Sequence, residues 1–359
     1  MLSSVSCPSC GARFVSVGVV LALVPLLLAC QQQQSTAHTA VADSAHAVEA
    51  DIVSLPLGAP LNQDDMEISG LAWKGDTLVV LPQYPSRHTS DGTFQAYGLT
   101  RTDIEHARTS ASAAALQPIP IPIRPRGLRR DALSYEGCEA IAFANGRVYV
   151  LIEAHRNDIM RGFLLTGSAP STDTMTVDVR MPHVIPAQAP LANMAYEALT
   201  VWHDTLLALY EANGAQVNPK PKAHQFNAAA EPVGAIPFPA LEYRLTDATS
   251  VDADGRFWVT NYFYPGERDV LVPATDSLRL QSNIGATHDT SDVVERLVEY
   301  EYRGSEIVRT ETPPLWLKLD GGTGRNWEGV VRFGNGFLIA TDQYPHSMLA
   351  YVEPPEGSG

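Results

Sequence analysis

A hairpin-like segment that recurs five times constrains this sequence more than any other feature. Each copy opens with a polar residue, continues with Gly or Ala and an apolar run, turns near its middle, and ends in a second apolar run. Another polar residue lies 14 positions after the first in every copy. The copies span residues 69–83, 139–153, 197–211, 247–261 and 328–342. One fixed length in every copy indicates a repeat architecture.

Turn residues occupy the middle of each copy, as tight hairpins require. Asn-Gly and Asp-Gly pairs stand at 145–146, 254–255 and 335–336, and they supply the positive φ angles of such turns. The flanking runs are too short for helices and rich in β-branched and aromatic residues, which is typical of strands. Each copy therefore predicts an antiparallel hairpin.

The intervals between the hairpins each contain about two more strand candidates. These candidates are residues 93–98, 118–123, 162–165, 175–180, 223–226, 233–238, 296–302, 306–309 and 347–352. Four strands per unit is the blade of a β-propeller. The last unit lacks an outer strand, and residues 51–57 form an unassigned strand that can supply it. We therefore predict an all-β, five-bladed propeller whose N-terminal strand closes the last blade.

A six-bladed ring is the alternative. It requires a degenerate blade inside the 81-residue interval between the fourth and fifth hairpins. Residues 266–293 in this interval show no hairpin that ends in paired polar residues, so we interpret them as an insertion.

The N-terminal residues have the layout of an export signal. Arg13 precedes an apolar run over residues 15–28, and the run ends in Leu27-Leu28-Ala29-Cys30. The run is shorter than the roughly 20 residues that span a bilayer, which disfavours the alternative of a membrane anchor helix. The Ala29-Cys30 step resembles the lipobox of bacterial lipoproteins, and this resemblance implies that Cys30 is lipidated.

We therefore expect a signal peptide over residues 1–29, the lipidated Cys30 with a polar flexible tether over 30–50, and the propeller over 51–359. The protein is expected in the bacterial cell envelope, held to the lipid bilayer through acylated Cys30 and facing the periplasm or the exterior. A monomer is expected. The net charge of −15 excludes nucleic acid as a partner, because its backbone is bound through Lys and Arg.

The polar ends of the hairpins meet at one rim of the predicted channel, because the second strand of a blade returns to the start of the first. One ring comprises Ser69, Glu139, Glu197, Asp247 and Glu328, and the residues beside it are Gln83, Glu153, Glu211, Asn261 and Asp342. Seven of these ten side chains are carboxylates. Two like charges about 4 Å apart cost on the order of 4 kcal/mol at an effective dielectric near 20.

Ionised acids at this density need either protons or a cation among them. An all-oxygen ligand set selects a hard ion, and a flexible ring of oxygens favours Ca²⁺ over Mg²⁺. We therefore predict a central Ca²⁺ site. The alternative is structural, with each acid bonding backbone N–H groups in its own loop.

One Ser or Glu per blade resembles the calcium-activated nucleotidases, or apyrases, which are five-bladed propellers with a central Ca²⁺. The segment 66–71 is similar to the opening of a blade in that family. The resemblance implies that Ser69, Glu139, Glu197, Asp247 and Glu328 face the metal, with Asp247 in the place of an expected Ser. The motifs at 135–137 and 326–330 are also similar to the esterase-like propeller domain associated with some phytases.

The loops at this rim supply candidate chemistry. We expect the catalytic acid or base among His155, His346, Glu153 and Asp342, acting on a phosphate ester or another ester. We expect an anionic small molecule or envelope component to be bound by Gln83, Glu211, Asn261, Arg156 and Arg325.

The alternative function is a non-catalytic propeller that recognises a glycan, peptide or protein of the envelope. Tyr84, Tyr264 and Tyr344 each precede a proline soon after a second strand. They form either a recognition surface at the channel mouth or ordinary loop packing.

Overall fold

The computed structural model describes residues 46–90, 93–110, 112–127, 135–156, 159–281, 283–321, 324–344 and 346–355. These belong to one unit that begins at residue 44, and the unit before it lies outside the described residues. The predicted signal peptide and Cys30 therefore lie outside them too. Among the described helices, none has the length and apolar character needed to cross a bilayer.

All five predicted hairpins form antiparallel strand pairs. Asn145 and Gly146 have φ angles of 50° and 71°, as expected for a tight turn. The pairs are β2 (Ile68–Lys74) with β3 (Thr77–Pro82), β6 (Gly137–Ala144) with β7 (Arg147–Arg156), β10 (Tyr196–Trp202) with β11 (Thr205–Tyr210), β14 (Arg244–Ala248) with β15 (Arg256–Phe263), and β19 (Trp327–Phe333) with β20 (Gly336–Thr341).

The strands between the hairpins extend each pair outward, close to the ranges that the sequence predicts. They are β4 (Phe94–Thr100), β5 (Ile119–Arg126), β8 (Ile159–Ser168), β9 (Met175–Ile185), β12 (Lys222–Phe226), β13 (Pro232–Pro237), β16 (Val294–Tyr302), β17 (Ile307–Arg309), β18 (Leu315–Trp316) and β21 (Leu349–Val352). Pairing runs in chain order within each set, and β18 pairs with β16 beside β17.

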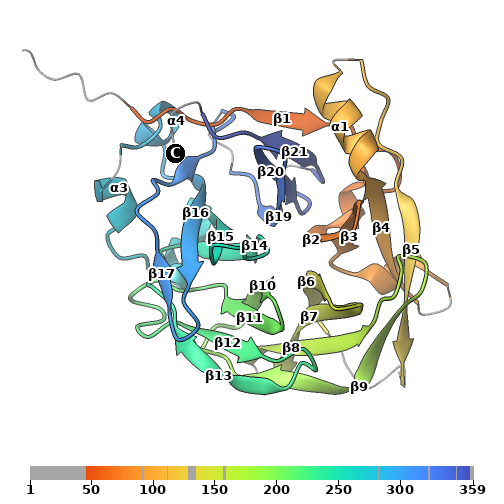
Figure 1. Cartoon of the computed structure of the whole chain (residues 1–359). Coiled ribbons are helices and arrows are strands. Elements are labelled where there is room, and N and C mark those ends of the chain that lie inside the picture. The colour runs from red at the N-terminus through yellow and green to blue at the C-terminus, as the bar shows by residue number, and fades with distance from the viewer. Residues whose placement is uncertain are drawn as a thin grey trace, which may run out of the picture. The chain divides into compact units, whose positions relative to one another are not determined.

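The first strands of the hairpins form a closed cycle in the described chain: β2 contacts β6, β6 contacts β10, β10 contacts β14, β14 contacts β19, and β19 contacts β2. Figure 1 shows these strands around a common centre with the later strands outside them. The fold is thus a β-propeller. β1 (Ile52–Leu55) pairs antiparallel with β21, so the predicted closure of the last sheet by an N-terminal strand is confirmed.

Two sets of strands share one sheet. β5 carries Pro120, Pro122 and Pro125, and its residues Ile123–Arg126 pair in parallel with β9. Pro125 lies within this paired part, opposite Val177, although a proline has no N–H to donate. The merger gives an eight-stranded sheet, so the number of blades stays a prediction.

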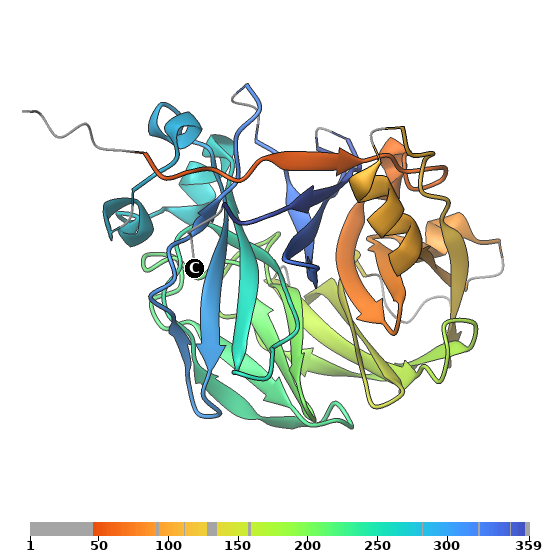
Figure 2. The ribbon, with the colours of Figure 1, turned by 45° about the horizontal axis from the view of Figure 1, so that its top comes forward.

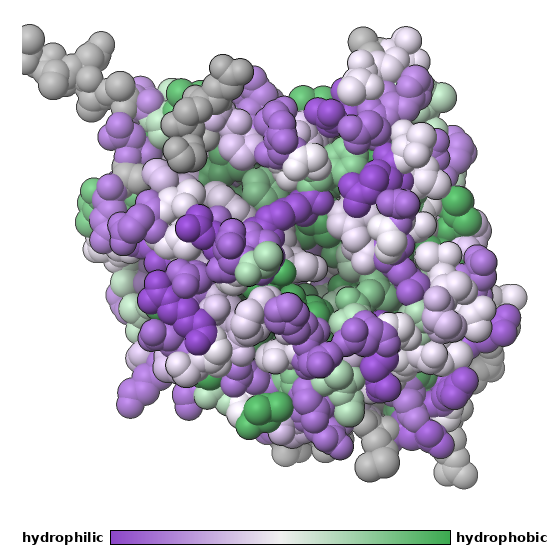
Figure 3. Space-filling model, viewed as in Figure 1, coloured by the Kyte–Doolittle hydropathy of each residue, from purple (hydrophilic) through white to green (hydrophobic). Residues whose placement is uncertain are grey.

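Apolar side chains pack between neighbouring sheets. Leu71, Val80 and Leu99 from the first set contact the cluster that holds Val331 and Leu338 from the last set. All five are nearly fully buried, and each such side chain contributes about 1.5–3 kcal/mol to stability. Figure 3 shows the complementary pattern, with polar residues over most of the visible face and apolar ones mainly in its central hollow.

Helices lie outside the ring of strands. α1 (Arg101–Thr109) was not predicted; Thr100 caps it by accepting a hydrogen bond from the Asp103 N–H at 3.1 Å, and Figure 2 shows it beside β1. The predicted insertion between β15 and β16 contains η3 (Pro265–Glu267), α2 (Arg268–Leu271), α3 (Ser277–Gln281) and α4 (Ala286–Asp289). Two further 3₁₀ turns are η1 (Asp64–Met66) and η2 (Pro85–His88).

The last residues of the predicted tether are part of the folded unit, which corrects the boundary expected at residue 51. Ala47 N–H donates to Ile284 O at 2.9 Å, and Ala50 N–H donates to Trp316 O at 2.8 Å. The Glu49 carboxylate accepts hydrogen bonds from the backbone and side chains of Thr287 and His288. These contacts fix residues 47–50 on the insertion.

Candidate functional site

A β-bulge lies at the start of the first strand in every inner hairpin. Pairing is interrupted between Ile68 and Gly70, 138 and 140, 196 and 198, 245 and 248, and 327 and 329. The residues inside the interruptions are Thr246 and the predicted ring residues Ser69, Glu139, Glu197, Asp247 and Glu328. A bulge leaves its residue unpaired and re-aims the side chain, so the repeated polar position has a structural cause.

The small residue after each ring position lets the inner strands approach one another. A Cβ added to Gly329 would lie 2.7 Å from Leu71 Cγ, and one added to Gly70 would lie 3.3 Å from Ala140 Cα. Larger side chains at these positions would push the inner strands apart.

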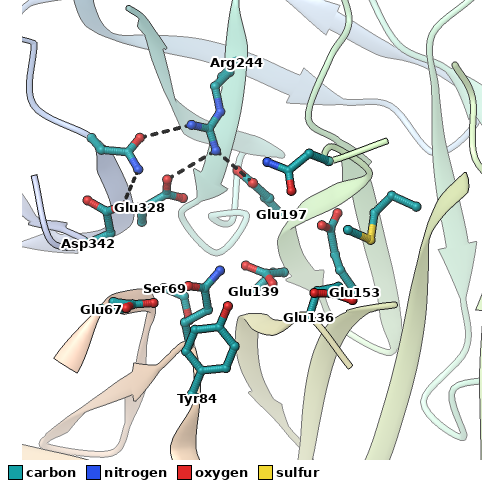
Figure 4. A pocket seen from close by; sticks show the side chains of 14 residues that line it. Glu67, Ser69, Tyr84, Glu136, Glu139, Glu153, Glu197, Arg244, Glu328 and Asp342 are labelled. Carbon is teal, nitrogen blue, oxygen red and sulfur yellow. Dashed lines mark hydrogen bonds and ion pairs between the residues drawn. The ribbon is translucent and has the colours of Figure 1, made fainter. Parts of the chain in front are cut away.

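The bulges direct Ser69, Glu139, Glu197 and Glu328 into one cavity of about 220 Å³ (Figure 4), and predicted residues near the ends of the second strands also line it. Seven of the ten predicted rim residues line it: Ser69, Gln83, Glu139, Glu153, Glu197, Glu328 and Asp342. Tyr84, which the sequence analysis places at the channel mouth, also lines it. The lining residues that sequence reasoning did not assign to the site are Glu67, Glu136, Met160, Asn193, Arg244 and Asn326.

Three predicted rim residues do not line the cavity. Asp247 is buried, and its carboxylate accepts from Val330 N–H at 2.7 Å, which is the structural alternative left open for the ring acids. The amide oxygen of Asn261 accepts from Arg296 Nε at 2.7 Å. Glu211 is fully buried and is paired with Arg244.

Arg244 is the main residue of the site that the sequence analysis missed. Its Nη2 lies 3.0 Å from Glu197 Oε1 and 3.4 Å from Glu328 Oε1, and its Nε bonds Glu211 Oε1. A guanidinium thus provides part of the positive charge that the ring of acids requires. The excess of carboxylates in the sequence indicated that a positive charge is needed at this site. It did not indicate Arg244, because Arg244 lies outside the 14-residue spacing that revealed the other positions.

The positive charge reaches only one side of the cavity. Figure 4 shows Arg244 beside Glu197 and Glu328, while Ser69, Glu139 and Glu153 lie on the other side. Burial, with Glu197 as the next cause, raises the pKa of Glu139 to about 8. Burial and the nearby Glu139 raise the pKa of Glu153 well above its usual range. Without another cation, these side chains hold protons at neutral pH.

Two buried acid oxygens, Glu197 Oε2 and Glu211 Oε2, accept no hydrogen bond from a described donor. Glu197 is 6% exposed and Glu211 is 0% exposed, so bulk water does not satisfy them. A proton or a bound cation is needed at these atoms.

The side chains available as ligands fit a hard cation, since all the acidic groups without a positive partner offer oxygen atoms. Ser69 Oγ donates its hydrogen to main-chain carbonyl groups, so it faces a cation with lone pairs only. Within the described residues, no three His, Cys, Asp or Glu side chains converge into a ready-made metal cluster. Binding a cation would therefore require side-chain rotation.

The predicted basic residues lie elsewhere. His155 is exposed, with Nδ1 at 3.1 Å from Glu136 Oε1 and Nε2 at 2.7 Å from Ala192 O. His346 is exposed as well, and neither histidine lines the cavity. Arg325 is buried and bonds Glu295 at 2.9 Å instead of facing the cavity, which corrects its expected role in binding substrate. The side chain of Arg156 lies outside the described parts.

Comparison with solved structures finds distant likenesses. The PQQ-bound aldose sugar dehydrogenase of Streptomyces coelicolor is 14% identical, with a TM-score of 0.44, and the match covers 86% of this chain and 99% of that chain. A glycosyl hydrolase of Bacteroides ovatus is 10% identical, with a TM-score of 0.44, over 85% of this chain and 94% of that chain. No protein-family model and no curated protein matches the sequence. Likenesses at this level carry no conclusion about activity.

Proposed function

We propose that this protein is a lipid-anchored propeller of the bacterial cell envelope that binds a hard divalent cation, Ca²⁺, in its acidic cavity and hydrolyses an ester there. One observation supports the proposal above others: seven carboxylates line a 220 Å³ cavity, and its one arginine lies on one side. On the opposite side the carboxylates have no positively charged partner among the lining residues, so a cation would stabilise them there.

Glu139, Glu153 and the buried Oε2 of Glu197 would hold the cation, with Ser69 Oγ as a neutral ligand. Ca²⁺ takes six to eight oxygen ligands in flexible geometry, which suits side chains that must rotate toward it. The resemblance of the blade openings to those of calcium-activated nucleotidases supports the same ion. When bound, such an ion supplies Lewis-acid polarisation of a phosphoryl or carboxyl oxygen.

Asp342 is the candidate general base of the reaction. Asp342 is held in place because Oδ1 accepts from Tyr344 N–H at 2.8 Å and Oδ2 accepts from Asn326 Nδ2 at 2.6 Å. Burial raises its pKa from the usual value, which brings a carboxylate closer to the range in which it takes a proton from water.

A second candidate is non-catalytic recognition, in which the cation only rigidifies the channel mouth. The position of His155 and His346 outside the cavity favours this candidate, because it removes the two side chains best suited to proton transfer near pH 7.

Calorimetric Ca²⁺ titration and melting temperature in Ca²⁺ against EDTA test the cation site. We expect Glu139→Gln and Glu153→Gln to weaken Ca²⁺ binding at least tenfold, whereas Glu306→Gln, on the exposed surface, keeps wild-type affinity. Wild-type affinity in both Glu139→Gln and Glu153→Gln would refute the site.

A panel of phosphate and carboxylic esters, assayed with and without EDTA, separates the two candidates. EDTA-sensitive turnover that Asp342→Asn reduces supports hydrolysis. A protein that binds Ca²⁺ but shows no turnover above background supports recognition instead.

A further inference from the structure

A second and larger hollow adjoins the acidic cavity. It has a volume of about 680 Å³ and shares Arg244, Asn326 and Asp342 with the cavity. Its size falls within the range of roughly 300–1,000 Å³ that is typical of small-molecule sites. We call it the tyrosine groove, because Tyr262, Tyr264 and Tyr344 line it together with Pro265, Glu267, Val293 and Gly324.

Two of its tyrosines expose most of their surface. Tyr264 is 55% exposed and Tyr344 is 62% exposed, although both stand in loops with well-defined hydrogen bonds. They come from loops after different hairpins, β14–β15 and β19–β20, so the groove spans the junction of two sheets. Exposed aromatic rings beside a hollow are typical of ligand contacts.

The Tyr264 ring packs against the backbone of its own loop at Gly266. A Cβ added to Gly266 would lie 2.4 Å from Tyr264 Cε1, so the ring packs directly on the glycine. Glu267 N–H donates to Tyr264 O at 3.0 Å and fixes the backbone of the loop. The ring therefore has limited freedom, which lowers the entropy cost of stacking a ligand on it.

The Tyr344 loop is fixed by backbone bonds that leave the ring itself exposed. Tyr344 N–H donates to Asp342 Oδ1, and Asn326 N–H donates to Tyr344 O at 3.2 Å. The fold thus holds the Tyr344 backbone without using the ring for packing, and a ring that is 62% exposed contributes little to the core.

The polar groups of the groove combine donors with acceptors. Arg244 Nη1 lies 3.0 Å from Tyr262 Oη and 3.3 Å from Asn326 Oδ1, so the Tyr262 hydroxyl keeps its own hydrogen to donate. Asp342 is an acceptor, and Glu267 Oε2 is buried without a partner in the described chain. Hydroxyl groups, which both donate and accept, match such a set.

The charges of the groove argue against two other classes of ligand that stack on aromatic rings, nucleotides and organic cations. Glu267 and Asp342 would repel the phosphate of a nucleotide, and the Arg244 guanidinium is already bonded to Glu197 and Glu211. An organic cation would find acceptors but would also meet the guanidinium.

From these contacts we propose that the tyrosine groove binds a neutral saccharide, whose ring faces stack on Tyr264 and Tyr344 and whose hydroxyls bond Asp342 and Glu267. The inference rests on the proposed recognition at this face and names the ligand class, but it does not depend on a bound cation.

Saturation-transfer NMR with the full chain tests the proposal, using cellohexaose, xylohexaose, mannohexaose and chitohexaose as probes, with AMP and choline as competitors of other chemistry. We expect at least one oligosaccharide to bind. Tyr264→Ala and Tyr344→Ala should each weaken its affinity about tenfold, whereas Tyr264→Phe should keep it because stacking needs only the ring. Val233→Ala, an exposed position on β13, is the matched control.

Unchanged melting temperatures in the tyrosine variants would show that any loss of binding is not a loss of fold. Glu139→Gln should leave saccharide binding intact even if it abolishes Ca²⁺ binding, so failure of the cation site and failure of the groove are separable. The proposal is overturned if none of the four oligosaccharides binds, if a variant that carries both Tyr264→Ala and Tyr344→Ala binds as well as wild type, or if choline or AMP binds in their place.

Discussion

Replacing Arg244 by Met should destabilise the fold strongly, and more so in alkaline than in acidic solution. The side chain is 12% exposed and bonds Glu197, Glu211 and Glu328, all of them buried. Removing one partner of a buried ion pair costs about 3–5 kcal/mol, because the remaining charge is left without compensation. For a domain of this size, this corresponds to a fall in melting temperature of roughly 5–8 °C.

The pH dependence follows from the acids that remain. Burial is the largest cause that raises the pKa values of Glu197, Glu211 and Glu328, and Arg244 opposes it for each. In the variant these pKa values rise further above those of the unfolded chain. The folded variant then binds protons that the unfolded chain has released, so its stability falls as pH rises above about 4.5.

Denaturation by guanidinium, followed by tryptophan fluorescence at pH 5 and pH 8, measures the effect. We expect the deficit of Arg244→Met to be at least twice as large at pH 8 as at pH 5. Arg303→Met is the control, since Arg303 pairs with Glu301 on the surface, and its midpoint should match wild type at both pH values. An Arg244→Met protein as stable as wild type at pH 8 would show that the guanidinium is not the counter-ion of the ring.

Three further predictions concern single contacts. In EDTA, wild-type stability should fall as pH rises from about 5 to 8, because the pKa of Glu139 is raised to about 8; denaturation of Glu139→Gln should show a flatter profile and a gain on the order of a few kcal/mol at pH 8. Gly329→Ala should cost about 1–3 kcal/mol of unfolding free energy by crowding Leu71, whereas Gly234→Ala, with open space around it, should not change the midpoint. Glu49→Ala should remove the carboxylate that lies 2.8 Å from Nδ1 of the buried His288 and speed amide hydrogen exchange at 285–289, and equal exchange rates would contradict the docking of residues 47–50.

The inner hairpins were predictable because their pattern is local: paired apolar runs, a turn residue and a fixed length. The same pattern located Glu139 and Glu328, since a bulge in each first strand turns the same position toward the channel, and it located Glu153, which is paired with Gly137 on the second strand beside Glu139. The closing strand β1 was predictable from the missing partner of β21.

The remaining features depend on contacts that a local pattern does not contain. Arg244 reaches the ring from the first residue of β14, and the acids it bonds come from β10, β19 and the residue after β11. Asp247 shares the ring pattern, yet the backbone N–H of Val330 on a neighbouring strand takes its carboxylate away from the cavity. The parallel pairing of β5 with β9 joins segments about 50 residues apart without any shared motif.

The pairing of β1 with β21 also bears on how the chain reaches its native state. Leu55 is opposite Leu349, so the ring closes only when residues almost 300 positions apart have met. Pairing at such sequence separation is slow, because closing a long loop costs conformational entropy before the stabilising contacts between the strands have formed. During that interval both strands present open edges that can pair with other chains. Ring closure is therefore the step at which we expect this protein to be most exposed to aggregation while it folds.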